Sequence, residues 1–357
     1  MKTVHRHILV GSTTPYSGKS SLLLSLGLQL QRQEFGLGYL KPLSQGEPPV
    51  DEDTRFLAQQ WNIVVPDPLV FISPQTLLER LRGNDQTNYQ DLLKEQLHRV
   101  GAEADFLFIE GGGTATEGKL FGLSLKQMAT VLDAPVILVV RYQAGKTIEG
   151  VLDVQEQLQG HPLSVIFNEV PVAQHSYVQE QLAPLFEARG MPVLGVLPLD
   201  PILHSVSVAE LVERLGAEVL CCENSLDLLV EQVNIGAMNV SSALKYFRKN
   251  NQKVVVTGGD RTDIQLAALQ TATNCLVLTG QLRPTPLILA RAQQMQVPIL
   301  CVAHDTLTTV QIINQAFEYA RFQQEAKTEC MVTMMEQYFN FEAFYAFCGL
   351  EQPVSSL

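Results

Sequence analysis

The sequence predicts an α/β protein built on a parallel sheet with helices on both faces. Six apolar, strand-like runs occur in the first half of the chain, at 7–10, 37–43, 105–109, 135–140, 163–167 and 193–197. Helical stretches lie between most of them, and near-continuous apolar strands separated by helices are typical of a buried parallel sheet. Ligands on such sheets bind beyond the carboxyl ends of the strands, so we expect the functional residues to lie just after each strand.

Composition limits the class of protein and its partners. The 357 residues suggest two domains with a short appendage, and 46% hydrophobic with 17% charged residues describes a globular chain with ample core. The net charge of −12 argues against a nucleic-acid partner. We find no run long enough to span a membrane and no cysteine spacing typical of zinc, and we expect no signal peptide before the first strand. We therefore expect a cytoplasmic protein without a membrane partner, with Cys275 and Cys301 in its core.

The loop from Gly11 to Ser20 organises the first half of the chain. It follows the first strand, consists mainly of small residues, ends in Gly18-Lys19-Ser20 and precedes a buried helix over 21–28. This context is typical of a phosphate-binding loop, in which backbone N–H groups and the helix dipole hold phosphate. We expect Lys19 to reach the outer phosphates and the Ser20 hydroxyl to reach Mg²⁺. The alternative is an ordinary helix start, since the usual glycine is replaced by Thr13.

The nucleotide-contacting residues that this loop predicts are Thr13, Thr14, Ser17, Gly18, Lys19, Ser20 and Ser21.

Charged side chains follow the second strand. Lys41, at the strand end, is either a second cation facing a phosphate or carboxylate, or a solvated lysine. Asp53, in an acidic cluster before a helix, is either a metal ligand or a helix N-cap.

An acid and three glycines follow the third long strand, as Glu110-Gly111-Gly112-Gly113. A carboxylate at a buried strand end costs free energy unless it is paired or bound to metal, and glycines let backbone approach a ligand closely. We expect Glu110 to bind Mg²⁺ opposite Ser20, with a capping acid in a flexible turn as the alternative. Asn168 ends the fifth run, where its amide would read a purine edge or form a turn.

Residues 1–215 resemble dethiobiotin synthetase and its relatives among the P-loop ATPases. The matching pieces are Gly18-Lys19-Ser20, Tyr39-Leu40-Lys41-Pro42, Asp53, Glu110 to Gly113, Pro135 to Val140 and Asn168. The resemblance implies that Lys19, Lys41, Ser20, Asp53 and Glu110 hold ATP, Mg²⁺ and a carboxylated substrate. It also implies that Lys19 and Lys41 are the catalytic residues and that Asn168 belongs to the base site.

Two departures from that family bear on function. Ser12 stands where the family loop has a glycine, and no stretch aligns with the family's diamino-acid pocket. The sequence of residues 13–17 is more similar to the N-terminal regulatory segment of long-form phosphate acetyltransferases than to dethiobiotin synthetase.

The second half predicts a smaller α/β domain. We expect one amphipathic helix over 208–220, a boundary at 221–225, and then strands that include 275–279 and 298–303. The stretch Gly258-Gly259-Asp260-Arg261-Thr262 resembles the motif of the DRTGG domain, and the match covers 215–325. Its expected ligand residues are Gly259, Asp260, Arg261 and Arg283. The structural alternative is a helix cap at Asp260 or Thr262 and an ion pair at Arg261.

The predicted organisation is therefore a P-loop NTPase-type domain over 1–220, a DRTGG domain over 221–325 and a helical tail over 326–357. The apolar residues of 330–339 fall at helical spacing, which predicts a helix packed on the body or on a partner subunit. The catalytic domain that follows this arrangement in phosphate acetyltransferases is expected to be absent.

Three functions remain open at this point. The first is a regulatory or sensor protein that binds Mg²⁺ and ATP, with weak ATPase activity left undecided. The second is an ATP-dependent ligase or synthetase that activates a small carboxylate or carbamate. The third is a non-catalytic interaction module, for which Ser12 is the best support. We expect a homo-oligomer, and a protein partner is possible.

Overall fold

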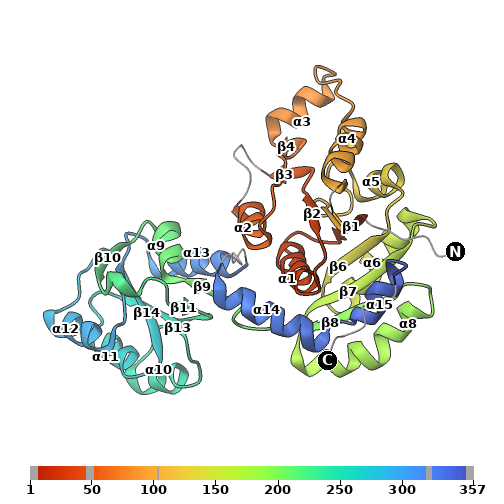
Figure 1. The fold of residues 1–357 in the computed structure, drawn as a ribbon. Helices are drawn as coiled ribbons and strands as arrows, with labels where there is room; N and C mark the ends of the chain where they lie inside the picture. The colour runs from red at the N-terminus through yellow and green to blue at the C-terminus, as the bar shows by residue number, and fades with distance from the viewer. Residues whose placement is uncertain (1–6, 46–51, 103, 319–323, 351–357) are drawn as a thin grey trace. The chain divides into compact units, whose positions relative to one another are not determined.

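The computed structural model describes residues 7–45, 52–102, 104–318 and 324–350, and it divides the chain into two compact units. Unit 1 comprises residues 1–199 together with 322–357, and unit 2 comprises residues 200–321. Figure 1 shows the two units in one view. Each unit is described by itself below.

Unit 1 contains a six-stranded parallel sheet with the order β2-β5-β1-β6-β7-β8. Its strands are β1 (His7–Ser12), β2 (Leu37–Leu40), β5 (Phe106–Glu110), β6 (Val136–Arg141), β7 (Leu163–Val170) and β8 (Val193–Pro198). All six strands lie where the sequence predicts them. They form because their apolar runs are buried on both faces, as parallel sheets require.

Helices cover both faces of this sheet, and the alternation of side chains along the strands assigns them. Leu9 and Ile109 point to one face, where they join a core with Met128 of α5 (Leu125–Leu132). Phe106 and Phe108 point to the other face. The Phe108 ring lies 6.0 Å from Trp61 of α2 (Glu52–Trp61) and the Phe106 ring lies 5.8 Å from Phe344 of α15 (Phe341–Phe347). The predicted fold class is confirmed.

The remaining helices and strands of unit 1 cover the sheet or connect its strands. They are α1 (Lys19–Gln31), β3 (Leu43–Gln45), β4 (Val70–Ile72), α3 (Pro74–Leu81), α4 (Tyr89–Gly101), α6 (Gly145–Leu158), α7 (His175–Tyr177), α8 (Ala183–Glu187) and α14 (Glu325–Tyr338). The strands β3 and β4 form a small parallel pair of their own.

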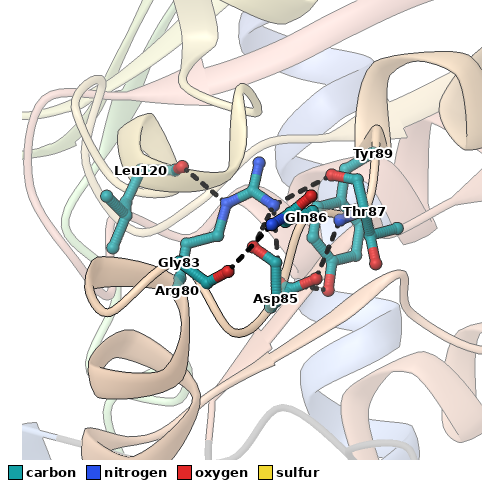
Figure 2. A network of polar contacts seen from close by, with 7 residues as sticks. All are labelled: Arg80, Gly83, Asp85, Gln86, Thr87, Tyr89 and Leu120. Carbon is teal, nitrogen blue, oxygen red and sulfur yellow. Dashed lines mark hydrogen bonds and ion pairs between the residues drawn. The ribbon is translucent and has the colours of Figure 1, made fainter.

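A single arginine organises the connection between α3 and α4 (Figure 2). Arg80 donates from Nη1 to the carbonyl oxygens of Asp85, at 2.9 Å, and Thr87, at 3.0 Å. Its Nε donates to the carbonyl of Leu120 at 3.3 Å, and the guanidinium lies 5.5 Å from the ring centre of Tyr89. One guanidinium thus satisfies three backbone carbonyls that would otherwise need water as their partner.

The C-terminal helices pack on unit 1. Glu336 of α14 accepts hydrogen bonds from Gln29, at 2.6 Å, and Arg32, at 2.8 Å. Tyr345 of α15 donates to the side chain of Gln33 at 2.5 Å. Of the two positions predicted for the tail, on the body or on a partner, the structure has the first.

Unit 2 contains a five-stranded mixed sheet with the order β10-β15-β14-β13-β12, in which only the β10–β15 pair is antiparallel. Its strands are β10 (Glu218–Cys221), β12 (Gln232–Ile235), β13 (Lys253–Gly258), β14 (Thr273–Thr279) and β15 (Ile299–Cys301). Among the described residues, five helices and a short antiparallel pair of strands accompany this sheet in unit 2: α9 (Val208–Leu215), α10 (Val240–Phe247), α11 (Thr262–Leu269), α12 (Pro286–Met295), α13 (Thr306–Glu318), β9 (Val206–Ser207) and β11 (Leu229–Val230). Cys275 and Cys301 are buried, as predicted.

The prediction of one helix over 208–220 is wrong in its last part. The helix α9 ends at Leu215, because Gly216 takes the left-handed conformation with φ of 56°. Residues Glu218–Cys221 then form β10 and pair with β15. A short apolar run such as this one cannot be assigned to strand or helix from its apolar content alone. Among the residues described, no helix has the length and apolar character that crossing a membrane requires.

Candidate functional site

The carboxyl ends of three neighbouring strands bring the predicted P-loop residues together. The registers pair Val10 of β1 with Glu110 of β5, and Leu40 of β2 with Ile109 of β5. The loop after β1, Lys41 after β2 and Glu110 at the end of β5 therefore share one edge of the sheet. This is the edge at which parallel α/β sheets hold their ligands.

The loop between β1 and α1 turns through Gly18. Gly18 has φ of 84°, a conformation that side chains rarely adopt, and it is the residue before the first turn of α1. The Asn168 amide lies against it, so that an added Cβ would stand 2.4 Å from Asn168 Nδ2. Asn168 donates from Nδ2 to the carbonyl of Ser17 at 2.9 Å. The amide expected at the base site therefore also supports the backbone of the loop.

Polar groups of the loop remain unmatched at the start of α1. The hydroxyls of Thr14 and Ser17 are buried and make no hydrogen bond with any residue that the structure describes. The start of α1 has no side-chain cap and no acidic residue in its first turn. Ser21 donates to the carbonyl of Gly18 at 3.0 Å, and Thr13 is half-buried beside α6. A loop that leaves buried donors and a helix N-terminus unmatched fits a phosphate group.

Lys19 lies at the base of this loop and is buried, with 7% of its surface exposed. Its ammonium donates to the Ser12 hydroxyl at 2.9 Å, and Ser12 donates onward to the Gly113 carbonyl at 2.9 Å. Burial lowers the pKa of Lys19 most, and Lys41 lowers it further, while Glu110 and Glu117 raise it. Ser12, which departs from the family pattern, thus connects Lys19 to the glycine loop after β5.

Glu110 is buried and bonds three side chains. Its Oε1 accepts from the Ser20 hydroxyl at 3.0 Å and lies 3.7 Å from Lys41 Nζ, while its Oε2 accepts from the Tyr39 hydroxyl at 2.8 Å. These partners offset the cost of burying a carboxylate. The sequence reasoning did not assign Tyr39 a role. Tyr39 lies on β2 two residues before Lys41, and in an extended chain this spacing places both side chains on the same face.

A magnesium ion fits this arrangement in part. The Ser20 hydroxyl and Glu110 carboxylate lie side by side, and Mg²⁺ commonly binds one or two protein oxygens together with waters and phosphates. Asp53 lies half-buried in the first turn of α2 and is not among the partners of Glu110 given above. Over the described ranges, no group of three or more His, Cys, Asp or Glu side chains is arranged to hold a metal ion.

Glu117 is a second residue that the sequence reasoning missed. Its carboxylate accepts hydrogen bonds from the Gly113 N–H and from the Gln45 amide. It lies seven residues after Glu110, across the glycine loop, and nothing in that spacing indicates which way a loop side chain will fold. The structure places it close enough to raise the pKa of Lys19.

The residues expected to bind a ligand in unit 2 already have partners. Arg261 donates to the Asp263 carboxylate at 3.1 Å and to the Met238 carbonyl at 3.0 Å, and Arg283 pairs with Glu218 at 2.5 Å. Asp260 is exposed, while Gly259 is buried beside the Leu282 carbonyl with no space for a side chain. The arginine pair with an acid is the one that the structural alternative requires, whereas no side chain caps α11.

Gln265 of α11 closes the same loop from inside the unit. Its Nε2 donates to the carbonyls of Gly258, at 3.0 Å, and Gly259, at 3.1 Å. Its Oε1 is buried and makes no hydrogen bond within the described part of the chain. One acceptor is therefore unmatched beneath the loop of the DRTGG motif.

Comparison with known proteins places both halves in known families. Residues 6–207 match the family described as AAA domain, and residues 210–316 match the DRTGG domain. The phosphate acetyltransferase of Pseudomonas putida is 28% identical and covers 83% of this chain and 45% of its own length. The phosphate acetyltransferase of Pseudomonas aeruginosa is 26% identical, with 93% and 50% covered. The chain thus spans about half the length of these curated relatives.

Among solved structures, the chain is similar to the CBS and DRTGG domains of the regulatory region of Clostridium perfringens pyrophosphatase, complexed with the activator diadenosine tetraphosphate. The identity is 20% and the TM-score 0.30, with 49% of this chain and 86% of the other covered. The family matches confirm the resemblance drawn from the motifs. The chain belongs to the AAA domain family of dethiobiotin-synthetase-like P-loop proteins, carries a DRTGG domain after it, and is homologous to the N-terminal region of phosphate acetyltransferases.

Proposed function

We propose that this chain is a regulatory or sensor protein in which the P-loop domain binds Mg²⁺ and ATP and the DRTGG domain binds a second ligand. The observation that carries the proposal is the buried Lys19 ammonium beneath a loop with two unmatched hydroxyls and an uncapped helix start. A buried cation with unmatched donors costs free energy unless an anion completes the site. A nucleotide polyphosphate would supply that anion.

The metal belongs to the same proposal. Ser20 and Glu110 would hold Mg²⁺, directly or through water, with Asp53 as the expected third oxygen. Bound there, the ion would neutralise charge on the outer phosphates. Lys41, 3.7 Å from Glu110, would add a second cation at the same edge.

The position of Lys41 also favours the second candidate, a ligase that phosphorylates a small carboxylate or carbamate. Its side chain is 15% exposed, so the cation is available to an anionic substrate beside the phosphates. An interaction module without activity is the third candidate. The engagement of Ser12 with both Lys19 and Gly113 weakens it, since Ser12 then builds the site rather than marking its loss.

A nucleotide titration of the Lys19→Ala variant tests the proposal. One charge-assisted phosphate contact is worth on the order of 1.5–3 kcal/mol, so we expect ATP affinity to fall by roughly ten- to a hundredfold or more. The matched control is Lys94→Ala, which removes an exposed charge from α4. Calorimetry with and without Mg²⁺ makes the measurement, and unchanged ATP affinity in Lys19→Ala would refute the P-loop assignment.

A phosphate-release assay then separates the candidates. The sensor candidate predicts slow release, or none, whatever acid is present. Release that requires a small carboxylic acid would select the ligase, and a homo-oligomer, the expected assembly in either case, would be seen by light scattering.

A further inference from the structure

Glu117 occupies the glycine loop after β5. The Gly113 N–H donates to one carboxylate oxygen, and the Gln45 amide donates to the other. The approach depends on glycine, because a Cβ at Gly112 would stand 2.8 Å from Glu117 Cβ and one at Gly113 would stand 3.0 Å from Glu117 Oε2. The Glu117 N–H is held in turn by Thr114, at 3.2 Å to its hydroxyl. The side chain is therefore fixed over the loop rather than directed into water.

The same glycine is part of the cationic site. The Gly113 carbonyl accepts from Ser12, which accepts from Lys19, each at 2.9 Å. A Cβ at Gly113 would lie 3.4 Å from Pro15 of the phosphate-binding loop. In such loops the backbone holds the inner phosphates and the lysine reaches the outer ones. A nucleotide bound in this way would have its outermost phosphate near Lys19 and Gly113.

We propose that Glu117 is a specificity-determining residue that makes the site discriminate against a third phosphate. The inference rests on the proposed nucleotide binding. The carboxylate takes the Gly113 N–H that a terminal phosphate oxygen would use, and its charge repels that phosphate. A diphosphate does not extend so far, so Glu117 opposes ATP more than ADP. Triphosphate binding then requires the Glu117 side chain to leave the loop.

The full-length Glu117→Gln variant tests this by calorimetric titration with ATP and with ADP, each with excess Mg²⁺. Glutamine keeps the size and can still accept from Gly113, but it carries no charge. Unit charges a few ångströms apart near a protein surface interact by more than 1.4 kcal/mol, so we expect ATP to bind about tenfold more tightly while ADP changes by less than about twofold. The matched control, Glu187→Gln, removes an exposed charge from α8 and should leave both affinities unchanged.

A second variant covers the case in which Glu117→Gln does not fold. Gln45→Ala removes the other partner of the carboxylate, and we expect the ratio of ATP to ADP affinity to rise in the same direction by a smaller factor. An unchanged ratio in every folded variant, or equal gains for ATP and ADP, overturns the assignment of Glu117 while leaving the nucleotide site intact. If wild type and variants bind neither nucleotide, the proposed function fails, and the role of Glu117 fails with it.

Discussion

At the scale of single residues, the site depends on how buried charges are matched. Lys19 and Glu110 are both buried, yet neither bonds the other directly. Lys19 bonds Ser12, and Glu110 bonds Ser20, Tyr39 and Lys41. A carboxylate with two hydroxyl donors and a cation is well placed to exchange one donor for a metal or its water.

We predict that Glu110→Gln weakens Mg²⁺-dependent ATP binding more than Mg²⁺-free binding. The neutral amide keeps the size of the side chain, and the hydroxyls of Ser20 and Tyr39 can rotate to suit it, so the fold is retained. Only the charge that would face the metal is lost. Titrations with and without Mg²⁺ measure the two losses, and equal losses would assign Glu110 a structural role instead.

At the scale of elements, the strand β13 has a buried lysine at its first residue and a polar loop after its last residue. Its first residue, Lys253, is fully buried and donates to the carbonyls of Asn250, at 3.0 Å, and Ala272, at 2.7 Å. Burial lowers the pKa of Lys253 to about 8. Beyond its last residue, Gly258, lies the loop whose carbonyls bond Gln265 and whose Arg261 bonds Asp263.

Because of Lys253, we expect the stability of unit 2 to increase as the pH rises from 8 to 10.5. Between pH 8 and 10.5 the unfolded chain holds the Lys253 proton more tightly than the folded chain, so the free energy of unfolding rises with pH. Below that window both states are protonated, and the penalty for burying the charge is constant. Lys253→Met removes the titrating group. The free energy of unfolding of wild type minus that of the variant should therefore increase from pH 8 to 10.5, by about 1.4 kcal/mol for each unit by which the folded and unfolded pKa values differ.

Urea unfolding of wild type and Lys253→Met at several pH values measures this difference. The control is Lys245→Met on α10, whose exposed side chain should leave the pH dependence unchanged. A difference between wild type and Lys253→Met that stays flat or falls from pH 8 to 10.5 would contradict the prediction.

We predict that the loop after β13 binds an adenine nucleotide. The uncapped start of α11 and the guanidinium of Arg261 are the groups that such a ligand would use. Thermal shift of the full-length Lys19→Ala protein, in which the P-loop is disabled, measures binding of mono-, di- and cyclic dinucleotides. We expect a rise in melting temperature that Arg261→Ala removes.

The exposed Arg248→Ala is the matched control for that experiment. If no nucleotide raises the melting temperature, or if Arg261→Ala leaves the shift in place, Arg261 serves only its ion pair with Asp263.

At the scale of the whole molecule, the chain consists of two units with separate cores. The P-loop unit draws its last two helices, α14 and α15, from beyond the DRTGG unit in sequence. The chain therefore leaves the first unit, forms the second and returns. Two binding sites alone do not make a sensor. A ligand shifts a conformational equilibrium only if it binds one of the two states more tightly than the other.

We predict two unfolding transitions in calorimetry, and a response of both to Mg²⁺ and ATP. Nucleotide at a hundred times its Kd stabilises the unit that binds it by about 2.7 kcal/mol, which should raise one transition directly. Coupling should move the other by a smaller amount. In the Lys19→Ala protein, run as the control, the first transition should not move, and the second should move only by what direct nucleotide binding to unit 2 contributes. A second transition that shifts equally in wild type and in Lys19→Ala would mean that the two units are not coupled.

The sequence by itself determined the six strands, the loop at Gly18-Lys19-Ser20 and the meeting of Lys19, Lys41 and Glu110 at one edge. These follow from apolar runs, from a local loop pattern and from the rule that parallel strands end together. The same reasoning was wrong at Gly216, where a strand follows the helix, because apolar content does not separate the two.

Only the tertiary structure decided how the side chains at that edge are matched. Ser12 looked like a departure from a pattern, yet it joins Lys19 to Gly113, 101 residues beyond it in the chain. Glu117 reaches the site through contacts that no spacing encodes, since a loop side chain can fold either way until its neighbours exclude one choice. Charge and hydrogen bonding between distant segments are satisfied only once the sheet has brought them together, and this is why the partners of these side chains could not be predicted from the sequence.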